Sequence, residues 1–516
     1  MERMHKKSAL PDTNGLLTAA HERGAELLWE RYEQQLPLCA FTANGLNCRK
    51  CFQGPCRINP FGDEPSRGVC GADRDQIVME NLFQATLEGV LDSARTSQLL
   101  GSGLADLELA DITPGLPSRV AERLSTMGLL PVRKADIFRV QNGYFSHKGF
   151  LPQTLKDLTR LGLIHYGILQ QGAPAPDDLS TKASFQADGI NVLIVGQASA
   201  EFLRTFEQQA GRRTEGKRIN LLTQGAYRLP GVPAAADQGS PELALGMNVD
   251  ALIVAPNASW PGVETLAPTY GVPVVLLDGA KSSGQTASEA IEQAVRHAQT
   301  AFYAAAARTI RPGNGDGSSA LLREQEMARV LQSGRIGGVV VLFGEPVAKQ
   351  AFFERTLALL EAAFANRALV LLGGELGSAI DALCAELDRR HGGLASAFAA
   401  ELQRDGLSFA TAFGSAFELP RVVSLLRGDG VCPTVFAFPE FYRASTWAAA
   451  VSLLSLGCTV QVGTRLPFWG SPSLTEAITG EWQRMTGARL LAAPALPDAG
   501  RQAEELAAHL AAGRDR

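Results

Sequence analysis

The chain has 516 residues, of which 46% are hydrophobic and 20% charged, and its formal net charge is −5. This is an ordinary globular composition, and the small negative charge gives no reason to expect a nucleic acid or an anionic membrane as a partner. No apolar run reaches the roughly 18–20 residues that span a bilayer. The basic first residues are not followed by the apolar stretch of a secretory signal. We therefore expect two to four domains and a cytoplasmic protein without membrane insertion.

The first 188 residues have mostly helical patterns, with one exception. Apolar residues recur at helical spacing in four stretches, which are 1–40, 76–100, 118–128 and 152–162. Residues 41–75 are instead rich in Gly, Pro, Asn and Cys, which is typical of a loop that needs a cross-link to hold its shape. We predict a helical domain over residues 1–188.

After residue 188 the pattern changes to short apolar runs separated by helical spacing. The candidate strands are 191–196, 218–222, 251–254, 272–277, 338–344, 368–372, 434–438 and 459–463. Continuous apolar strands that alternate with helices predict parallel sheets with helices on both faces. A linker-like segment at 308–319 divides them, so we expect an α/β protein with two doubly wound, Rossmann-like domains, 189–325 and 326–516. No G-x-G-x-x-G follows any of these strands, so no dinucleotide site is predicted.

Five of the eight cysteines fall between Cys39 and Cys70, which favours a metal site over a disulfide framework in a protein of this size. Four of them form the run Cys48-x2-Cys51-x4-Cys56-x13-Cys70. Thiolates are soft ligands that suit iron in a sulfide cluster or zinc. Zinc ribbons usually present two C-x2-C pairs, and only the first pair here has that spacing. The spacing favours a [4Fe–4S] cluster and leaves a four-cysteine zinc site as the alternative.

The same stretch resembles the N-terminal signature of the nickel–iron carbon monoxide dehydrogenases, which are related to the hybrid-cluster proteins. The likeness lies in Cys-x2-Cys-x2-Gly-Pro-Cys-Arg-Ile over residues 48–58 and in Gly-Val-Cys-Gly-Ala-Asp over residues 68–73. In that family these four cysteines hold the B-cluster, an electron-relay [4Fe–4S] centre. Pro439-Glu440 and the segments 457–460 and 470–472 look like the family's C-terminal block. The resemblance implies a helical cluster domain followed by two Rossmann-like domains, in a chain shortened between about 100 and 190.

The family's D-cluster lies on the two-fold axis of a homodimer and takes two cysteines from each subunit. Cys39 matches the first of these positions, whereas the second is Asn47. Two thiolates per dimer are too few for an all-cysteine cubane. We expect this cluster to be absent or altered, so that Cys39 is either a residual ligand on the dimer axis or simply a buried cysteine.

The family's active centre, the C-cluster, is held by one histidine and five cysteines, and this chain departs from the pattern at all six. By local motif these positions are Gln197, Ala226, Ala258, Glu345, Glu375 and Ala416. Neighbouring motif residues remain at Pro261, Lys349 and Arg421. The resemblance therefore implies that the ligands of the nickel–iron centre have been replaced, and we do not expect nickel.

The family's proton-carrying residues are replaced as well. Its active-site lysine falls on Ser445, and its histidines would fall within residues 92–95, which contain none. Carbon monoxide oxidation needs one metal to bind carbon, another to hold hydroxide, and bases to remove protons. We therefore predict that this reaction does not occur, and the sequence leaves open whether the protein is an enzyme.

Glu345 and Glu375 directly follow predicted strands, where open α/β sheets form clefts. One hypothesis is a metal-dependent oxidoreductase in which these carboxylates bind a different cluster or a divalent metal. The other is that they are solvated or ion-paired residues that fill the cavity. Cys384 and Cys458 lie on apolar patterns and are interpreted as buried structural thiols, and Cys432, like them, matches no ligand position.

The sequence and the resemblance together predict a carbon monoxide dehydrogenase-like iron–sulfur protein with one [4Fe–4S] cluster per subunit. It would act in electron transfer or in redox-linked partner binding. A further alternative is a scaffold protein in which the cluster only cross-links the chain and stabilises the fold. The resemblance also implies a homodimer, a redox partner such as a ferredoxin, and an anaerobic setting.

Overall fold

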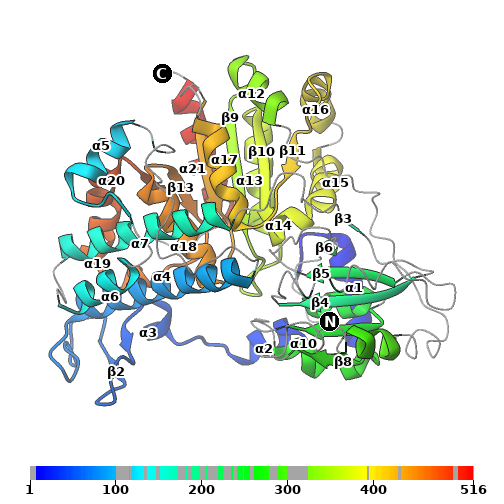
Figure 1. Cartoon of the computed structure of the whole chain (residues 1–516), viewed down its shortest axis with the longest axis horizontal. Coiled ribbons are helices and arrows are strands. Elements are labelled where there is room, and N and C mark those ends of the chain that lie inside the picture. The colour runs from blue at the N-terminus through cyan, green and yellow to red at the C-terminus, as the bar shows by residue number, and fades with distance from the viewer. Residues whose placement is uncertain are drawn as a thin grey trace.

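The structure is a computed structural model. It describes the residues 7–99, 116, 118–132, 136–146, 151–172, 182–183, 189–196, 202, 205, 219–224, 234–235, 241–247, 249–255, 261–277, 289, 291–298, 324–391, 394–427, 432–491 and 498–514. Two six-stranded parallel sheets and a layer of long helices make up these parts (Figure 1). The predicted α/β class with parallel sheets is confirmed. The predicted linker at 308–319 lies outside the described residues.

The N-terminal part of the chain is helical apart from one short hairpin. Its elements are α1 (Pro11–Glu22), α2 (Leu28–Gln34), α3 (Ala40–Ala43), β1 (Asn47–Cys48), β2 (Cys56–Arg57), α4 (Arg74–Leu99), α5 (Ser118–Thr126), α6 (Asp136–Ser146) and α7 (Leu151–Gln171). The start of α4 carries a capping box, because the Gln76 amide donates to Asp73 Oδ1 and the Asp73 amide donates to Gln76 Oε1, both at 3.0 Å. The cap fixes where the cysteine-rich loop ends and the helix begins.

The first sheet has the strand order β3-β6-β5-β4-β7-β8, and all its pairs are parallel. Its strands are β3 (Lys182–Ala183), β4 (Ile190–Val195), β5 (Ile219–Gln224), β6 (Ala234–Ala235), β7 (Ala251–Val254) and β8 (Val274–Leu276). Its described helices are α9 (Pro241–Ala244), η3 (Leu245–Met247), α10 (Pro261–Leu266) and η4 (Ala267–Tyr270). Every residue of β4 is buried, as its continuous apolar sequence predicts for a central strand.

The second sheet has the order β11-β10-β9-β12-β13-β14 and is also parallel throughout. Its strands are β9 (Gly338–Gly344), β10 (Ala368–Gly374), β11 (Ala410–Ala412), β12 (Thr434–Phe438), β13 (Thr459–Val462) and β14 (Arg489–Leu491). The helices around it are α12 (Glu324–Gln332), α13 (Glu354–Ala365), α14 (Glu375–Ser378), α15 (Ile380–His391), α16 (Leu394–Arg404), η5 (Ala416–Glu418), α17 (Leu419–Arg427), α18 (Ala444–Ser455), η6 (Pro467–Gly470), α19 (Pro472–Glu476), η7 (Ala477–Glu481), α20 (Trp482–Thr486) and α21 (Ala499–Arg514). Each predicted strand is present, while the three-residue strands β11 and β14 were not predicted.

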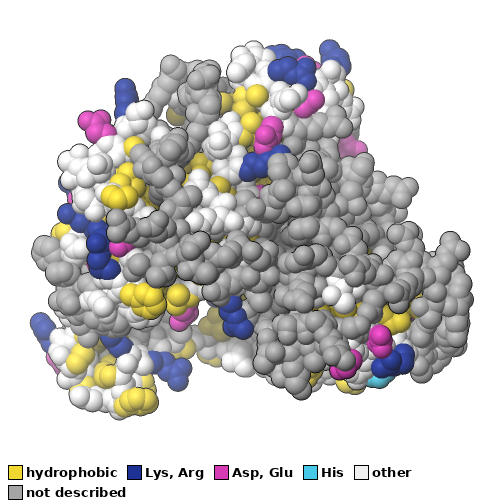
Figure 2. Space-filling view, in the orientation of Figure 1, with side chains coloured by type: hydrophobic (Ala, Val, Ile, Leu, Met, Phe, Trp, Pro, Cys, Tyr) yellow, Lys and Arg dark blue, Asp and Glu magenta, His cyan; other side chains and the backbone are white. Residues whose placement is uncertain are grey.

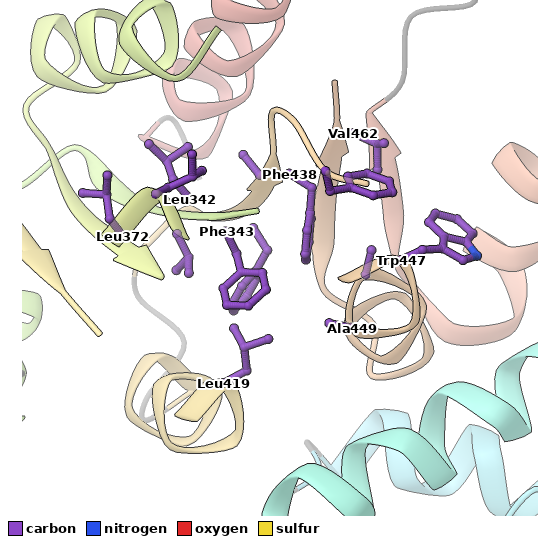
Figure 3. Close-up of a cluster of buried hydrophobic side chains, with 14 of the residues drawn as sticks. Leu342, Phe343, Leu372, Leu419, Phe438, Trp447, Ala449 and Val462 are labelled. Carbon is purple, nitrogen blue, oxygen red and sulfur yellow. The ribbon is translucent and has the colours of Figure 1, made fainter. Parts of the chain in front are cut away.

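Helix α18 joins the second sheet to the helical layer. It contacts α4 and α7 on one side and β12 and β13 on the other, and nearly all its residues are buried. Glycines let the helices approach: a Cβ at Gly89 of α4 would lie 2.1 Å from the Ala444 carbonyl oxygen, and one at Gly162 of α7 would lie 2.3 Å from Ser455 Oγ. The main core contains Phe343, Phe438 and Trp447 (Figure 3), and the Trp447 indole donates to Thr86 Oγ1 of α4 at 2.9 Å. The helical layer is therefore packed onto the second sheet.

The first residues of the chain contact both sheets. Ser8 pairs with Phe352, beyond β9, while the Leu28 amide of α2 donates to Glu242 Oε2 of α9 at 2.8 Å. In Figure 1, α1 and α2 accordingly lie beside the first sheet, away from α4 and α7. The division into three domains at residues 188 and 325 stays a prediction. Among the described residues, no helix is both long enough and apolar enough to cross a membrane.

Candidate functional site

The cysteine-rich loop is folded back by the hairpin of β1 and β2. These two strands pair antiparallel with Cys48 opposite Cys56, so two of the four predicted ligands are neighbours across the hairpin. Cys51 lies in the connecting turn, where its carbonyl oxygen accepts from the Gly54 amide at 3.3 Å. A turn of this kind presents the thiol-bearing residues at one end of the hairpin, and Cys51 is exposed there.

The fourth predicted ligand, Cys70, lies in a second turn beside Cys56. The Gly68 amide donates to the Ala72 carbonyl oxygen at 2.8 Å, and the Val69 amide points at Cys56 Sγ at 3.4 Å. A Cβ at Gly68 would lie 3.5 Å from the same sulfur, so this backbone is close to the thiol. Backbone amides near cluster sulfurs are a means by which proteins tune iron–sulfur centres.

The electrostatics of Cys48 place it with two of the other thiols. Burial raises the pKa of the Cys48 thiol, and the charges of Glu80, Cys56 and Cys70 raise it further. The thiolate forms of Cys48, Cys56 and Cys70 therefore repel one another. A metal that takes up the thiolates and releases their protons would relieve that repulsion.

By their chemistry the four cysteines suit either an iron–sulfur cluster or a single zinc ion. In the part of the chain that the structure describes, no three His, Cys, Asp or Glu side chains are placed to hold one metal ion. A zinc ion needs all four sulfurs about 2.3 Å from one centre. The four thiolates of a [4Fe–4S] cluster each bind a different iron, so they surround a wider body than one zinc ion.

The two positions that correspond to the dimer-axis cluster also lie close together. Hydrogen bonds from the side chain and backbone of Thr42 lower the pKa of the Cys39 thiol. The Asn47 side-chain amide donates to Thr42 Oγ1 at 3.2 Å, so Cys39 and Asn47 flank the same threonine. Cys39 is exposed, and the interpretation of it as a buried cysteine is therefore wrong.

A second candidate site lies at the carboxyl ends of β9, β10 and β12. Glu345 follows β9 and Glu375 follows β10, and both are about 1% exposed. The strands are in register there, and the Gly374 amide donates to the Gly414 carbonyl oxygen beyond β11 at 2.9 Å. Parallel strands thus bring together residues that lie 30 or more positions apart in the chain.

Residues after β12 bind both of these carboxylates. Arg443 Nη2 donates to Glu375 Oε1 at 2.8 Å, and the Tyr442 hydroxyl donates to the same oxygen at 2.9 Å. The Thr446 hydroxyl donates to Glu345 Oε1 at 2.5 Å. Glu375 Oε2 is buried and has no hydrogen-bond partner among the described atoms. One arginine and two hydroxyls therefore occupy the space between the two strand ends.

Burial controls the protonation of this site. Burial raises the pKa of both Glu345 and Glu375, and the positive charge of Arg443 opposes this rise in both. At Glu345 the negative charge of Glu375 raises the pKa further. Glu440 is also buried, and burial raises its pKa to about 7 despite a hydrogen bond from the Val347 amide. Glu345, whose pKa is raised to about 7, and Glu440 can therefore hold protons near neutral pH, unlike ordinary surface glutamates.

Sequence patterns did not indicate the partners of these glutamates. No sequence motif contains Tyr442, Arg443 and Thr446. What could have indicated them is their position just after β12, the strand that pairs with β9. The predicted positions Gln197, Ala226 and Ala258 lie outside the described residues. Ala416 is half-buried in η5, and Ser445 is buried in the first turn of α18.

The other named residues lie away from a shared site. Arg421 is ion-paired with Glu324 of α12. Cys384, Cys432 and Cys458 pack against the main core but are only half-buried, so Cys384 and Cys458 are less buried than predicted.

Comparisons with known proteins agree on one family. Residues 46–103, which include the four cysteines, match the model of the Prismane/CO dehydrogenase family. The carbon monoxide dehydrogenase of Rhodospirillum rubrum is 30% identical over 201 residues, which is 35% of this chain but only 31% of that protein. The carbon monoxide dehydrogenase of Methanopyrus kandleri is 22% identical over 577 aligned positions, covering 87% of this chain and 88% of that protein.

The fold is also that of a solved relative. Carbon monoxide dehydrogenase IV from Carboxydothermus hydrogenoformans superimposes with a TM-score of 0.80 over 99% of both chains. Only 20% of the aligned residues are identical, so this likeness concerns the fold.

Proposed function

We propose, on the premise that the chain belongs to the carbon monoxide dehydrogenase and hybrid-cluster protein superfamily, that it is an electron-transfer protein. One [4Fe–4S] cluster per subunit would be held by Cys48, Cys51, Cys56 and Cys70. The observation that carries the proposal is the contrast between the two sites. All four relay ligands are present on an exposed loop, whereas Glu345, Glu375 and Ala416 stand where the family has ligands of its active centre.

The chain's own residues would bind and shield the cluster. The four thiols lose their protons and supply one sulfur to each iron. The Val69 amide beside Cys56 Sγ would stabilise the charge on that sulfur, and the Lys50–Glu80 ion pair lies next to the loop. A cluster of this type exchanges one electron at a time. The exposure of Cys51 and Cys70 leaves a short path for that electron to a partner.

The surface around the loop suits a protein partner. Phe52, Phe61 and Val69 are strongly exposed, and Figure 2 shows hydrophobic and basic side chains together over the loop at the lower left. Exposed apolar side chains in one place mark interaction surfaces. By resemblance we assign this surface to the second subunit of a homodimer and to a small redox protein such as a ferredoxin, in an anaerobic cytoplasm.

The cluster can be tested by anaerobic reconstitution of the full chain with iron and sulfide. We expect about four irons per chain and, after reduction, the EPR signal of a reduced [4Fe–4S] cluster. Cys56→Ser should lose most of the iron, whereas the matched control Cys432→Ser, whose thiol packs against the core, should keep it. Zinc in place of iron in the protein as isolated, with no EPR signal after reconstitution, would overturn the proposal.

We further propose that the protein does not oxidise carbon monoxide. Ser445 stands at the position of the family's lysine and is buried in the first turn of α18, and the glutamates after β9 and β10 are bound by Arg443 and Thr446. Carbon monoxide should not reduce a viologen dye in the presence of the reconstituted protein. Nickel in the isolated protein together with such reduction would contradict the proposal.

A second candidate function rests on the unpartnered oxygen Glu375 Oε2. A divalent cation bound there and by Glu345 would make the site a metal-dependent oxidoreductase centre, because hard divalent ions prefer carboxylate oxygens. Arg443 already neutralises Glu375, which favours the first function. Calorimetric titration with Mn²⁺ distinguishes the two functions. Binding that is abolished in Glu375→Gln and preserved in the surface variant Glu504→Gln would support the metal site. Absence of Mn²⁺ binding to the wild-type chain would exclude it.

A further inference from the structure

A cavity of about 490 Å³ opens at the carboxyl ends of β9, β12 and β13. Its wall is made of residues 346–349 after β9, 441–444 after β12, and 464–467 after β13, and α4 closes it with Leu82 and Ala85. This size falls within the roughly 300–1,000 Å³ of small-molecule sites.

The cavity lies where open parallel sheets bind ligands. From β9 the chain proceeds to β10 and β11 on one side, and it then returns to β12 on the other side of β9. The crevice between β9 and β12 is therefore the switch point of the sheet, where the loops at the strand ends diverge. The segments 346–349 and 441–444 are the two loops that leave this crevice.

The lining combines an apolar interior with a positive mouth. The interior is formed by Leu82, Ala85, Phe441, Trp447 and Leu466. The charged lining residues are the cations Lys349, Arg443 and Arg465, and no Asp or Glu is among the lining residues that the structure describes. A cavity lined by one sign of charge over low-dielectric walls attracts the opposite charge.

The three cations differ in how far they are already neutralised. Arg443 donates to Glu375, and Arg465 donates to the neutral side-chain oxygen of Asn44 at 2.5 Å. Lys349 is exposed at the mouth and has no hydrogen bond or ion pair with any described residue. Two cationic groups at the mouth therefore have no carboxylate partner there.

We propose that this pocket binds an amphipathic organic anion. The aromatic or hydrocarbon body of the ligand fills the space beside Trp447 and Leu466, and its carboxylate or phosphate pairs with Lys349 and Arg465. A divalent cation does not suit the pocket, because the lining offers positive groups and no carboxylate. The inference is independent of the iron–sulfur cluster, so each can fail without the other.

The test uses the full chain and 8-anilinonaphthalene-1-sulfonate, a fluorescent probe with an aromatic body and one negative charge. We expect saturable binding of one probe per chain. Lys349→Gln should weaken it about 5–20-fold, as expected for a lost charge-assisted contact, while Lys156→Gln on α7 should leave it unchanged. The neutral probe N-phenyl-1-naphthylamine should bind both variants within about twofold of wild type, because its binding is apolar.

Two further measurements locate the probe and identify the head group. Ala85→Trp fills the interior and should abolish binding of both probes, with the unfolding transition of the variant recorded to show that it is folded. Displacement by 4-phenylbutyrate assigns a carboxylate ligand and displacement by phenyl phosphate assigns a phosphate, whereas 4-phenylbutanol, which lacks the charge, should displace the anionic probe less than either acid does at equal concentration. The proposal is overturned if binding is not saturable, if Lys349→Gln has no effect on the anionic probe, if folded Ala85→Trp still binds, or if neither acid competes.

Discussion

The cysteine loop and the carboxylate site at the ends of β9 and β10 differ in what holds them together. The loop has exposed cysteines, an exposed Phe52 and a hairpin whose two strands have two residues each. Among the described residues, Ile58, Ala72 and Ile77 form a small core beneath it. The carboxylate site is buried, and Tyr442, Arg443 and Thr446 bind its two glutamates directly.

The difference shows what each site depends on for its shape. A site at the ends of strands is positioned by the sheet, so other polar side chains can fill it while the core stays packed. A site on a loop with few apolar contacts depends on the metal for its shape, because the cross-link replaces a core. The cysteines would then be essential to the structure of the loop. The glutamates would matter only for the local balance of charge in the carboxylate site.

Removal of the metal should have the largest effect and should be confined to the loop. An iron chelator applied to the reconstituted protein, or the variant Cys56→Ser, should make residues 46–73 susceptible to proteases. The main unfolding transition should move little, because the core lies beneath α18 and the second sheet. Limited proteolysis with mass spectrometry would follow the cleavage, and loss of the whole fold on chelation would break the comparison.

Loss of Arg443 should strongly destabilise the carboxylate site. Arg443→Met leaves Glu375 buried without its cation, which costs about 3–5 kcal/mol in the free energy of unfolding at pH 8. The loss should be smaller at pH 5, because a buried carboxyl freed of its arginine takes up a proton more readily. Urea unfolding would measure both values. The double variant Arg443→Met with Glu375→Leu should recover most of the stability, and equal losses in the single and double variants would contradict this account.

Glu440 should make the protein less stable as the pH rises. Its pKa is about 7 in the folded chain and 4.5 is the ordinary value, so the folded state binds its proton more tightly. The associated stability is complete below pH 4.5 and is lost as the pH rises to about 7, by up to about 3 kcal/mol. Glu440→Gln should reduce the loss between pH 5 and 8, whereas the surface variant Glu504→Gln should not. If the free energy of unfolding changed with pH in the same way in the wild type and in both variants, the role of Glu440 would be contradicted.

His165 in the helical layer should give a smaller effect of the opposite sign. It lies between Ser93 of α4 and Ser452 of α18, at 2.8 Å and 2.7 Å, and burial lowers its pKa to about 3 from 6.5. Its contribution is complete above pH 6.5 and is lost as the pH falls towards 3, by about 1–2 kcal/mol between pH 6.5 and 5. His165→Gln should show a flatter curve in that range by urea unfolding. If the free energy of unfolding of His165→Gln fell as steeply with pH as that of the wild type, His165 would not be the cause of the pH dependence.

Much of the candidate loop was predictable because its parts are close in the sequence. Cys48 to Cys70 span 23 residues, and their spacing with the glycines between them is a local pattern. The carboxylate site was predictable only in part. Glu345 and Glu375 could be placed at strand ends, but Tyr442 lies 97 residues from Glu345, and nothing local connects the two.

The sequence by itself determined the cysteine spacing, the alternation of apolar strands with helices, and the position of Glu345 and Glu375 directly after two of the strands. These are properties of neighbouring residues, and the buried strands β4 and β9 follow from their continuous apolar runs. The tertiary structure alone decided that β12 lies beside β9, so that Arg443 neutralises Glu375 and the crevice becomes a pocket with a positive mouth. The physical reason is that strand order depends on how helices such as α18 pack on the sheet, and that packing joins residues about a hundred positions apart.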